Sequence, residues 1–179
     1  MPDTRQLLAR LSRLVSYPGI GYQEDVEACA TDLGRIDATA RAAFQPFADG
    51  VRGLSTEVRQ ELYTRTFDLN PVCTLDVGWH LYGEQYERGA FMVRMRQALA
   101  RHGIVEGGEL PDHLSHLLLL AGRLDDAEAA GFVRNSLRPA LDKMLASLEK
   151  SETPFTALVA TVRCVLVALA PAAPEVHHA

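Results

Sequence analysis

The stretch Leu7-Leu8-Ala9-Arg10-Leu11-Ser12-Arg13-Leu14-Val15 sets a pattern that recurs along this chain. Its leucines and its valine return every three or four residues, so they share one face of a helix. The run stops at Tyr17-Pro18-Gly19, which is a turn signal. The stretch therefore predicts an amphipathic helix. The rest of the chain repeats this pattern and shows no convincing strand-like alternation.

The same periodicity predicts further helices. A long one is expected from about Gln23 to Ala48, with Gly34 and Pro46 as the two points at which it could break. The other helices are expected at 55–70, at 74–83 (one or two turns), and at 85–102, 112–124, 125–148 and 154–170. Ser55, Asp112 and Thr153 are the expected N-caps of three of them, because their side-chain oxygens can accept hydrogen bonds from the first free amides.

These helices predict an all-α fold, a single-domain bundle of about seven helices over residues 1–170, followed by a disordered tail at 171–179. The length of 179 residues suits one domain with a substantial core. Apolar residues make up 47% of the chain and charged residues 23%, a composition typical of globular proteins and not of disordered ones.

Charge and hydropathy narrow the function classes. The 18 Lys and Arg residues against 23 Asp and Glu leave a net charge of −5, which disfavours nucleic-acid binding. The most apolar stretch, 155–170, contains Arg163 and is shorter than the roughly 20 residues that a spanning helix needs. The N-terminus lacks the apolar core of a signal peptide, and the three cysteines form no CxxC pair. We therefore expect a cytoplasmic protein with no nucleic-acid partner and no membrane insertion.

The sequence carries no phosphate-binding glycine loop and no HExxH, GxSxG or ExxH motif. His113-x-x-His116 places two imidazoles on one helical face and could bind a metal, with Glu109 as a weak further ligand. Pairs of this kind more often cap a helix or form hydrogen bonds. Cys73 could act as a nucleophile only if a base such as His80 reached it.

Six of the twelve aromatic residues fall between Tyr63 and Phe91. Such a stripe often forms core alone. Here charged groups, among them Asp68 and Arg88, lie within it, and charges are costly to bury unpaired. The stretch is therefore typical of a groove with apolar walls and a few polar groups, a kind of site that binds amphipathic peptide helices.

Four short motifs, taken in order, resemble one known family. They are Leu11-Ser12-Arg13-Leu14-xx-Tyr17-Pro18, Tyr63-xxx-Phe67-Asp68, Tyr82-Gly83-xx-Tyr86-xx-Gly89 and Glu109-Leu110-Pro111-Asp112-His113-Leu114. The chain resembles the NarJ/TorD group of redox enzyme maturation chaperones, and within it the NarJ-like branch.

The resemblance implies an all-α protein that is not an enzyme and has no cofactor of its own. It implies a dedicated chaperone that binds the N-terminal segment of the apo catalytic subunit of a nitrate reductase or type II dimethyl sulfoxide reductase. Such a chaperone supports insertion of the molybdenum cofactor before export or membrane docking. The proteins that synthesise this cofactor are a second implied class of partner. One departure is Leu118-Leu119-Leu120, where the family often carries a glutamate, and a more apolar groove is expected there.

The predicted client-binding residues combine the aromatic stripe with the motif residues. Asp68 is expected either to pair with Arg88 or to contact a cationic client, and we favour the client. The full set is Tyr63, Phe67, Asp68, Trp79, Tyr82, Tyr86, Arg88, Phe91, Asp112, His113 and His116.

Two other classes of function stay open at this point. One is a small metal-binding enzyme that uses His113 and His116. The other is a helical scaffold with no link to molybdenum.

Overall fold

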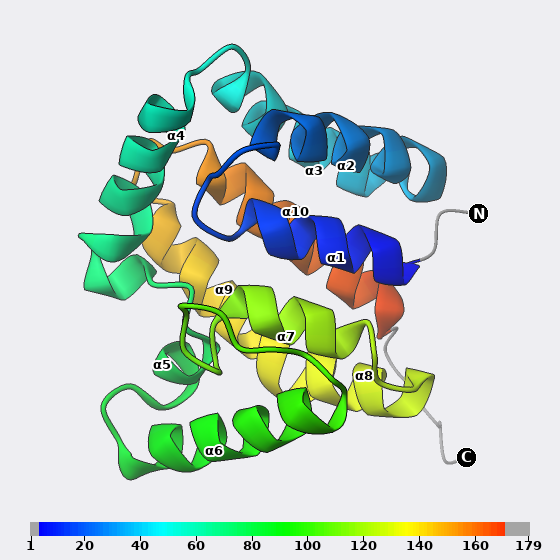
Figure 1. The fold of residues 1–179 in the computed structure, drawn as a ribbon, viewed down its shortest axis with the longest axis vertical. Helices are drawn as coiled ribbons and strands as arrows, with labels where there is room; N and C mark the ends of the chain where they lie inside the picture. The colour runs from blue at the N-terminus through cyan, green and yellow to red at the C-terminus, as the bar shows by residue number, and fades with distance from the viewer. Residues whose placement is uncertain (1–3, 171–179) are drawn as a thin grey trace, which may run out of the picture.

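Helix α10 (Phe155–Leu169) runs through the middle of the molecule (Figure 1). It is apolar on most of its faces and packs against α3 and α9. The computed structural model describes residues 4–170. It contains the helices α1 (Thr4–Leu14), α2 (Tyr22–Ile36), α3 (Ala38–Val51), α4 (Thr56–Tyr63), α5 (Val77–Tyr82), α6 (Tyr86–Arg101), α7 (Leu114–Ala121), α8 (Asp126–Phe132) and α9 (Arg138–Leu148), with π-helical segments η1 (Thr64–Asp68) and η3 (Val133–Leu137) and a 3-10 turn η2 (Pro71–Cys73).

The helices form an all-α bundle, as the sequence predicts. In Figure 1, α2 and α3 lie above α1 and α10, while α7, α8 and α9 lie below them and α6 forms the lower edge. Helix α4 and η1 run along one side. Within residues 4–170 no strand forms, and the backbone pairing of strand type is a single isolated bridge between Asp76 and His113. The expected disordered tail, 171–179, lies outside the described residues.

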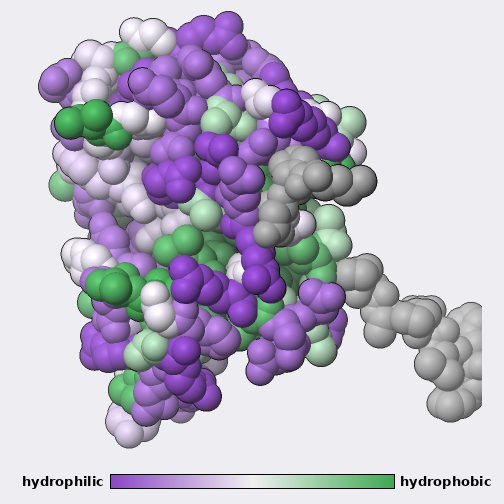
Figure 2. Space-filling model, turned by 45° about the vertical axis from the view of Figure 1, so that its right-hand side comes forward, coloured by the Kyte–Doolittle hydropathy of each residue, from purple (hydrophilic) through white to green (hydrophobic). Residues whose placement is uncertain are grey.

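The surface separates into hydrophilic and hydrophobic regions. Figure 2 shows green surface gathered around the middle height of one face, between largely purple upper and lower parts. None of the helices within residues 4–170 combines the length and the hydropathy that crossing a lipid bilayer requires.

The predicted helix from Gln23 to Ala48 is wrong in one respect, because it is two helices. The chain breaks at Asp37, which is extended (φ −152°, ψ 109°). Its carboxylate accepts hydrogen bonds from the amides of Thr39 (2.8 Å) and Ala40 (3.2 Å) and so caps α3. Gly34 and Pro46, the expected breaking points, both lie inside helices.

Two other long helices are confirmed, each with a π-helical segment. Helix α4 begins after its predicted cap Ser55 and continues into η1, which ends at Asp68. The helix predicted at 125–148 consists of α8, η3 and α9 in succession. Segment η3 ends just before Pro139, which has no amide hydrogen to donate to the preceding turn, so a local change of hydrogen-bonding register is accommodated there.

The predicted cap of α7 is wrong by one residue. His113 is the N-cap, and its Nδ1 accepts a hydrogen bond from the amide of Ser115 (3.3 Å). Asp112 does not cap the helix because its carboxylate lies against Arg88. At α10 the N-cap position is Pro154, one residue after the predicted cap, and the Thr153 hydroxyl accepts a hydrogen bond from the Phe155 amide (3.4 Å).

Candidate functional site

A pocket of about 440 Å³ opens where η1, η2, α5, the start of α6 and the segment before α7 meet. The first four of these elements follow one another along the chain, and Figure 1 shows the segment between α6 and α7, which comes later in the sequence, running back towards η1 and α5. Six of its lining residues belong to the predicted site. The pocket, which we call the aromatic–acidic pocket, is lined by Tyr63, Phe67, Asp68, Pro71, Thr74, Leu75, Asp76, Trp79, Arg88, Glu109, Leu110 and His113.

One wall is built from two aromatic rings on successive turns of the α4–η1 helix. Tyr63 and Phe67 pack edge to face, with ring centroids 5.0 Å apart, and both also pack against Phe155 of α10. The Tyr63 hydroxyl donates to the carbonyl of Val15 (3.2 Å), and burial raises the pKa of Tyr63. This wall is therefore continuous with the core and rigid.

Arg88 is the cation of the pocket, and it is fully engaged. Its Nη2 lies 3.0 Å from Asp76, its Nε lies 3.4 Å from Asp112, and its guanidinium carbon lies 5.6 Å from the centre of the Trp79 ring. The alternative in which Asp68 pairs with Arg88 is therefore wrong. Asp68 is exposed at the pocket, and it forms no ion pair with any residue in 4–170.

Asp112 lies behind Arg88 and is fully buried. Its Oδ1 has no hydrogen-bond partner among the described residues, and burial, together with the nearby Asp76, raises the pKa of this carboxyl. The carboxylate reaches this place because position 78 is glycine. A Cβ there would lie 2.5 Å from Asp112 Oδ2 and 3.3 Å from Arg88 Cγ. Asp112 therefore positions Arg88 and does not itself face the pocket.

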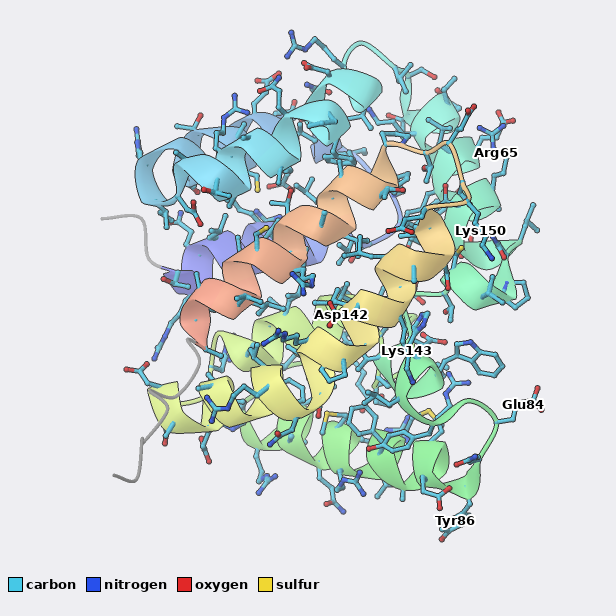
Figure 3. All side chains as sticks on the ribbon, turned by 180° about the vertical axis from the view of Figure 1, so that it is seen from behind. Arg65, Glu84, Tyr86, Asp142, Lys143 and Lys150 are labelled. Carbon is cyan, nitrogen blue, oxygen red and sulfur yellow. The ribbon has the colours of Figure 1, made fainter. Side chains whose placement is uncertain are left out.

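Helix α5 presents Trp79 to the pocket and is fixed from two directions. The His80 Nε2 bonds to the carbonyl of Thr74 (2.7 Å), and burial lowers the pKa of His80. From the other side, Lys143 of α9 donates to the carbonyl of His80 (2.7 Å). Figure 3 shows Lys143 on α9, near the end of α5.

The two predicted histidines have structural roles at the pocket. His116 Nε2 accepts from the amide of Gly107 (3.2 Å), so its Nδ1 carries the proton and donates to the carbonyl of Leu110 (2.9 Å). These bonds hold the segment that brings Glu109 and Leu110 to the pocket.

His113 lines the pocket while it caps α7. Burial, followed by the nearby His116, lowers the pKa of His113 to about 4. At neutral pH the ring is therefore uncharged. Because Nδ1 accepts from the Ser115 amide, the ring proton lies on Nε2.

The pocket carries an excess of negative charge. Asp68, Asp76 and Glu109 line it, against Arg88 alone among cations. Partial desolvation raises the pKa of Glu109, and the neighbouring Asp68 and Asp76 raise it further. The site thus combines apolar and aromatic walls with an acidic rim.

Several predicted site residues lie outside this pocket. Tyr82 and Phe91 pack against each other, with ring centroids 5.7 Å apart, and Phe91 is buried. Tyr86 is 89% exposed and points away from the molecule (Figure 3). The more apolar groove expected at Leu118-Leu119-Leu120 is wrong, because Leu118 and Leu120 are buried in the core and none of the three lines the pocket.

Sequence reasoning did not include Pro71, Thr74, Leu75, Asp76 or Leu110 among the site residues, and it named Glu109 as a candidate only for metal binding. Glu109 belongs to a quoted motif, which was the available signal. Asp76 reaches the pocket through its bridge to His113, in which the Val77 amide donates to the Asp112 carbonyl and the Leu114 amide to the Leu75 carbonyl (2.9 Å each). No local pattern indicates such a pairing.

The histidines considered as metal ligands and the cysteine considered as a nucleophile lie in surroundings that disfavour those roles. Within the described part of the chain no three His, Cys, Asp or Glu side chains gather in a way that could bind a metal ion. Both nitrogens of His116 are already engaged in hydrogen bonds. Cys73 is fully buried, and burial raises the pKa of its thiol, which disfavours the reactive thiolate.

The family model described as "Nitrate reductase delta subunit" matches residues 33–160. The "Nitrate reductase molybdenum cofactor assembly chaperone NarJ" of Escherichia coli (strain K12) is 30% identical over 161 residues, which cover 84% of this chain and 65% of that relative's length. The "Probable nitrate reductase molybdenum cofactor assembly chaperone NarJ" of Bacillus subtilis (strain 168) is 26% identical over 161 residues, which cover 88% of this chain and 86% of the relative.

Both relatives are named for assembly and not for catalysis, in agreement with the resemblance drawn from the motifs. The matched region contains the whole aromatic–acidic pocket. Because the family model covers more than half of the chain, this protein belongs to the nitrate reductase delta subunit family.

Proposed function

We propose that this protein is an assembly chaperone for a molybdenum-containing nitrate reductase or a related type II dimethyl sulfoxide reductase. It binds the N-terminal segment of the apo catalytic subunit in the cytoplasm and keeps that subunit competent to receive the molybdenum cofactor before export or membrane docking. The observation that carries this proposal is the aromatic–acidic pocket, present in a chain whose relatives are named as cofactor assembly chaperones.

The pocket has the chemistry that such a segment needs. An amphipathic, basic helix offers apolar side chains and cations, and the pocket offers Phe67, Trp79 and Leu110 beside acidic groups. Leu69 (74% exposed) and Val72 (56% exposed), which adjoin lining residues in sequence, extend the apolar surface beyond it. The segment can thus lie across the surface while one part of it enters the pocket.

A chaperone must also release its client. An affinity near micromolar, about −8 kcal/mol, is strong enough to hold the segment and weak enough for folding of the client to withdraw it. The rigid wall formed by Tyr63 and Phe67 favours a preformed site, so little binding free energy is lost in ordering it.

The test is calorimetric titration of the protein with a peptide copied from the N-terminus of the catalytic subunit of the organism's own nitrate reductase. We expect a dissociation constant near micromolar, a negative heat-capacity change from apolar burial, and only modest weakening between low and physiological salt. Trp79→Ala should weaken binding several-fold.

Tyr86→Ala is the matched control, because it removes an aromatic ring that lies outside the pocket. It should leave the affinity unchanged, and melting temperatures of both variants show whether each remains folded. Absence of binding, complete loss of binding at moderate salt, or equal effects of the two substitutions would contradict the proposal.

A further inference from the structure

We propose that the aromatic–acidic pocket binds a single arginine side chain of the client segment, with the carboxylates of Asp68 and Glu109 holding its guanidinium group. This inference rests on the proposed function and specifies which chemical group of the client enters the site.

The first support is the distribution of charge among the lining residues. Arg88 is shared between Asp76 and the buried Asp112, so its charge is already compensated. Asp68 and Glu109 line the same pocket, and neither forms an ion pair with any residue in 4–170. Two carboxylates that face one partly desolvated space destabilise each other, and a cation placed between them removes that repulsion.

The second support is the position of the two carboxylates on separate elements. Asp68 ends η1, whereas Glu109 lies in the segment before α7 that His116 holds in place. A guanidinium group presents five N–H donors in a planar fork and can bridge two carboxylates, whereas an ammonium group is a compact, strongly hydrated point charge. The arrangement therefore favours arginine over lysine.

The walls suit the remainder of an arginine side chain. Phe67, Trp79 and Leu110 offer apolar surface to its methylene groups and its planar face. Arg88 already shows this combination within the same pocket, since it bonds to Asp76 and lies over the ring of Trp79. The volume of about 440 Å³ lies towards the small end of the usual range for ligand pockets, which suits one side chain and not a whole helix.

His113 supplies the pocket with a hydrogen-bond donor for an occupant. His113 is 4% exposed, lines the pocket and carries its ring proton on Nε2, yet this donor has no hydrogen-bond partner within residues 4–170. Among the described residues the buried side-chain atom without a partner is Asp112 Oδ1, so the His113 donor is open to solvent at the pocket and free to bond to an occupant. A carbonyl of the same client segment can accept this hydrogen bond while the guanidinium group lies between the carboxylates.

The first experiment tests the pocket without any client. N-acetyl-L-arginine amide is titrated into the full chain, and the indole signal of Trp79, the chain's single tryptophan, is followed by NMR. We expect saturable millimolar binding that the neutral isostere N-acetyl-L-citrulline amide does not show, and that N-acetyl-L-lysine amide shows at least several-fold more weakly. Equal binding of the arginine and citrulline probes, or of the arginine and lysine probes, would overturn the inference.

The second experiment couples protein and peptide. Each arginine of the client peptide is replaced in turn by citrulline, and binding is measured to the wild type and to the variants Asp68→Asn and Glu109→Gln. We expect one arginine whose replacement costs about tenfold with the wild type and little with either variant, because the partner has already been removed. Both substitutions are at exposed residues, so the fold should be retained.

Glu84→Gln is the matched control, since Glu84 is an exposed carboxylate outside the pocket (Figure 3). It should show the wild-type response to every peptide. If the peptide binds but no arginine couples to Asp68 or Glu109, the inference fails and the proposed function stands. If the peptide does not bind while the arginine probe does, the proposed function fails and the pocket's preference for arginine is retained.

Discussion

Gly78 allows three side chains, two from α6 and one from the segment before α7, to meet against α5. A Cβ at this position would lie 2.5 Å from Asp112 Oδ2, 3.1 Å from the ring of Phe91 and 3.3 Å from Arg88 Cγ. Gly78→Ala should therefore push Asp112 and Arg88 apart and lower the free energy of unfolding by about 1–3 kcal/mol, as overpacking usually does. Urea unfolding measures this.

Gly89→Ala is the control for that substitution. Gly89 also lies in a helix, α6, but a Cβ there meets no atom within 4 Å. Alanine has the better helix propensity, so this variant should be as stable as the wild type or more stable by up to about 1 kcal/mol. Equal destabilisation by the two substitutions would show that the contact with Asp112 is not what requires glycine at position 78.

His113 makes stability depend on pH. Burial lowers its pKa from 6.5 to about 4 in the folded protein, so below pH 6.5 the unfolded chain binds the proton more readily. Stability should therefore fall as the pH drops from about 6.5 to about 4, with a loss near 2 kcal/mol between pH 7 and pH 5. Asp112 acts in the opposite direction, because its raised pKa favours the folded state as its carboxyl becomes protonated.

His113→Asn isolates this effect, because asparagine can still cap α7 but does not titrate. Urea unfolding at pH 7 and pH 5 should show that the wild type loses about 2 kcal/mol more than the variant over this interval. A wild type and variant with the same pH dependence would mean that His113 is protonated in the folded state as easily as in the unfolded chain.

At the scale of helices, the sequence predicts most elements correctly because each buries one apolar stripe. The break between α2 and α3 was misplaced for the same reason, since the stripe of Val26, Leu33, Ala40 and Phe44 continues across it. What breaks the helix is a local competition, in which the Asp37 carboxylate bonds to the amides of Thr39 and Ala40. In the sequence this break is marked only by one aspartate, and aspartate is too common a residue to predict a break by itself.

The candidate site was predictable where its residues are neighbours along one helix. Tyr63, Phe67 and Asp68 lie within two turns, so the spacing alone brings them together. Asp76 reaches the pocket through a long-range contact, its bridge to His113, and Glu109 is held there by the irregular segment that the hydrogen bond from His116 to Leu110 fixes. The Asp112 carboxylate binds Arg88, which lies 24 residues away in sequence, and therefore does not cap α7 as expected.

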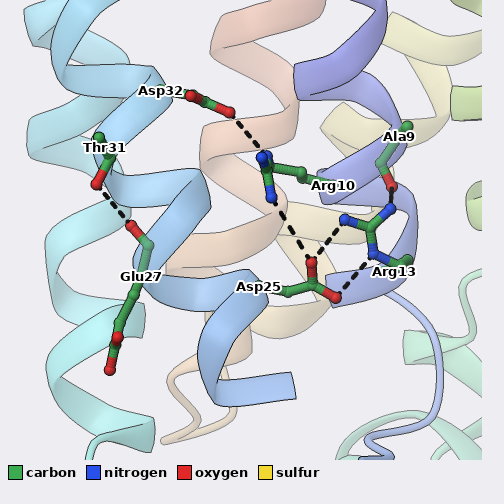
Figure 4. A network of polar contacts seen from close by, with 7 residues as sticks. All are labelled: Ala9, Arg10, Arg13, Asp25, Glu27, Thr31 and Asp32. Atoms are coloured by element: carbon green, nitrogen blue, oxygen red, sulfur yellow. Dashed lines mark hydrogen bonds and ion pairs between the residues drawn. The ribbon is translucent and has the colours of Figure 1, made fainter. Parts of the chain in front are cut away.

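At the scale of the whole molecule, a cluster of charged side chains joins α1 to α2 at a distance from the pocket. Arg13 binds both carboxylate oxygens of Asp25 (2.6 and 2.7 Å), and Arg10 binds Asp32 (2.7 Å), as Figure 4 shows. Helix α2 lies in the upper part of Figure 1, whereas α5 and α6 lie in the lower part. Since α1 also packs on α7, the cluster stabilises the bundle without touching the pocket.

Asp32→Ala should therefore separate stability from binding. Asp32 is 7% exposed, and its removal leaves Arg10 without its closest partner, which should lower the free energy of unfolding by about 1–2 kcal/mol, because Arg10 is still partly solvated. Glu27→Gln, an exposed change on the same helix, should stay within about 0.5 kcal/mol of the wild type. Calorimetric titration at a temperature where all three proteins are folded should give the same affinity for the client peptide. A loss of affinity that parallels the loss of stability in Asp32→Ala would instead show that the α1–α2 contact and the aromatic–acidic pocket are coupled.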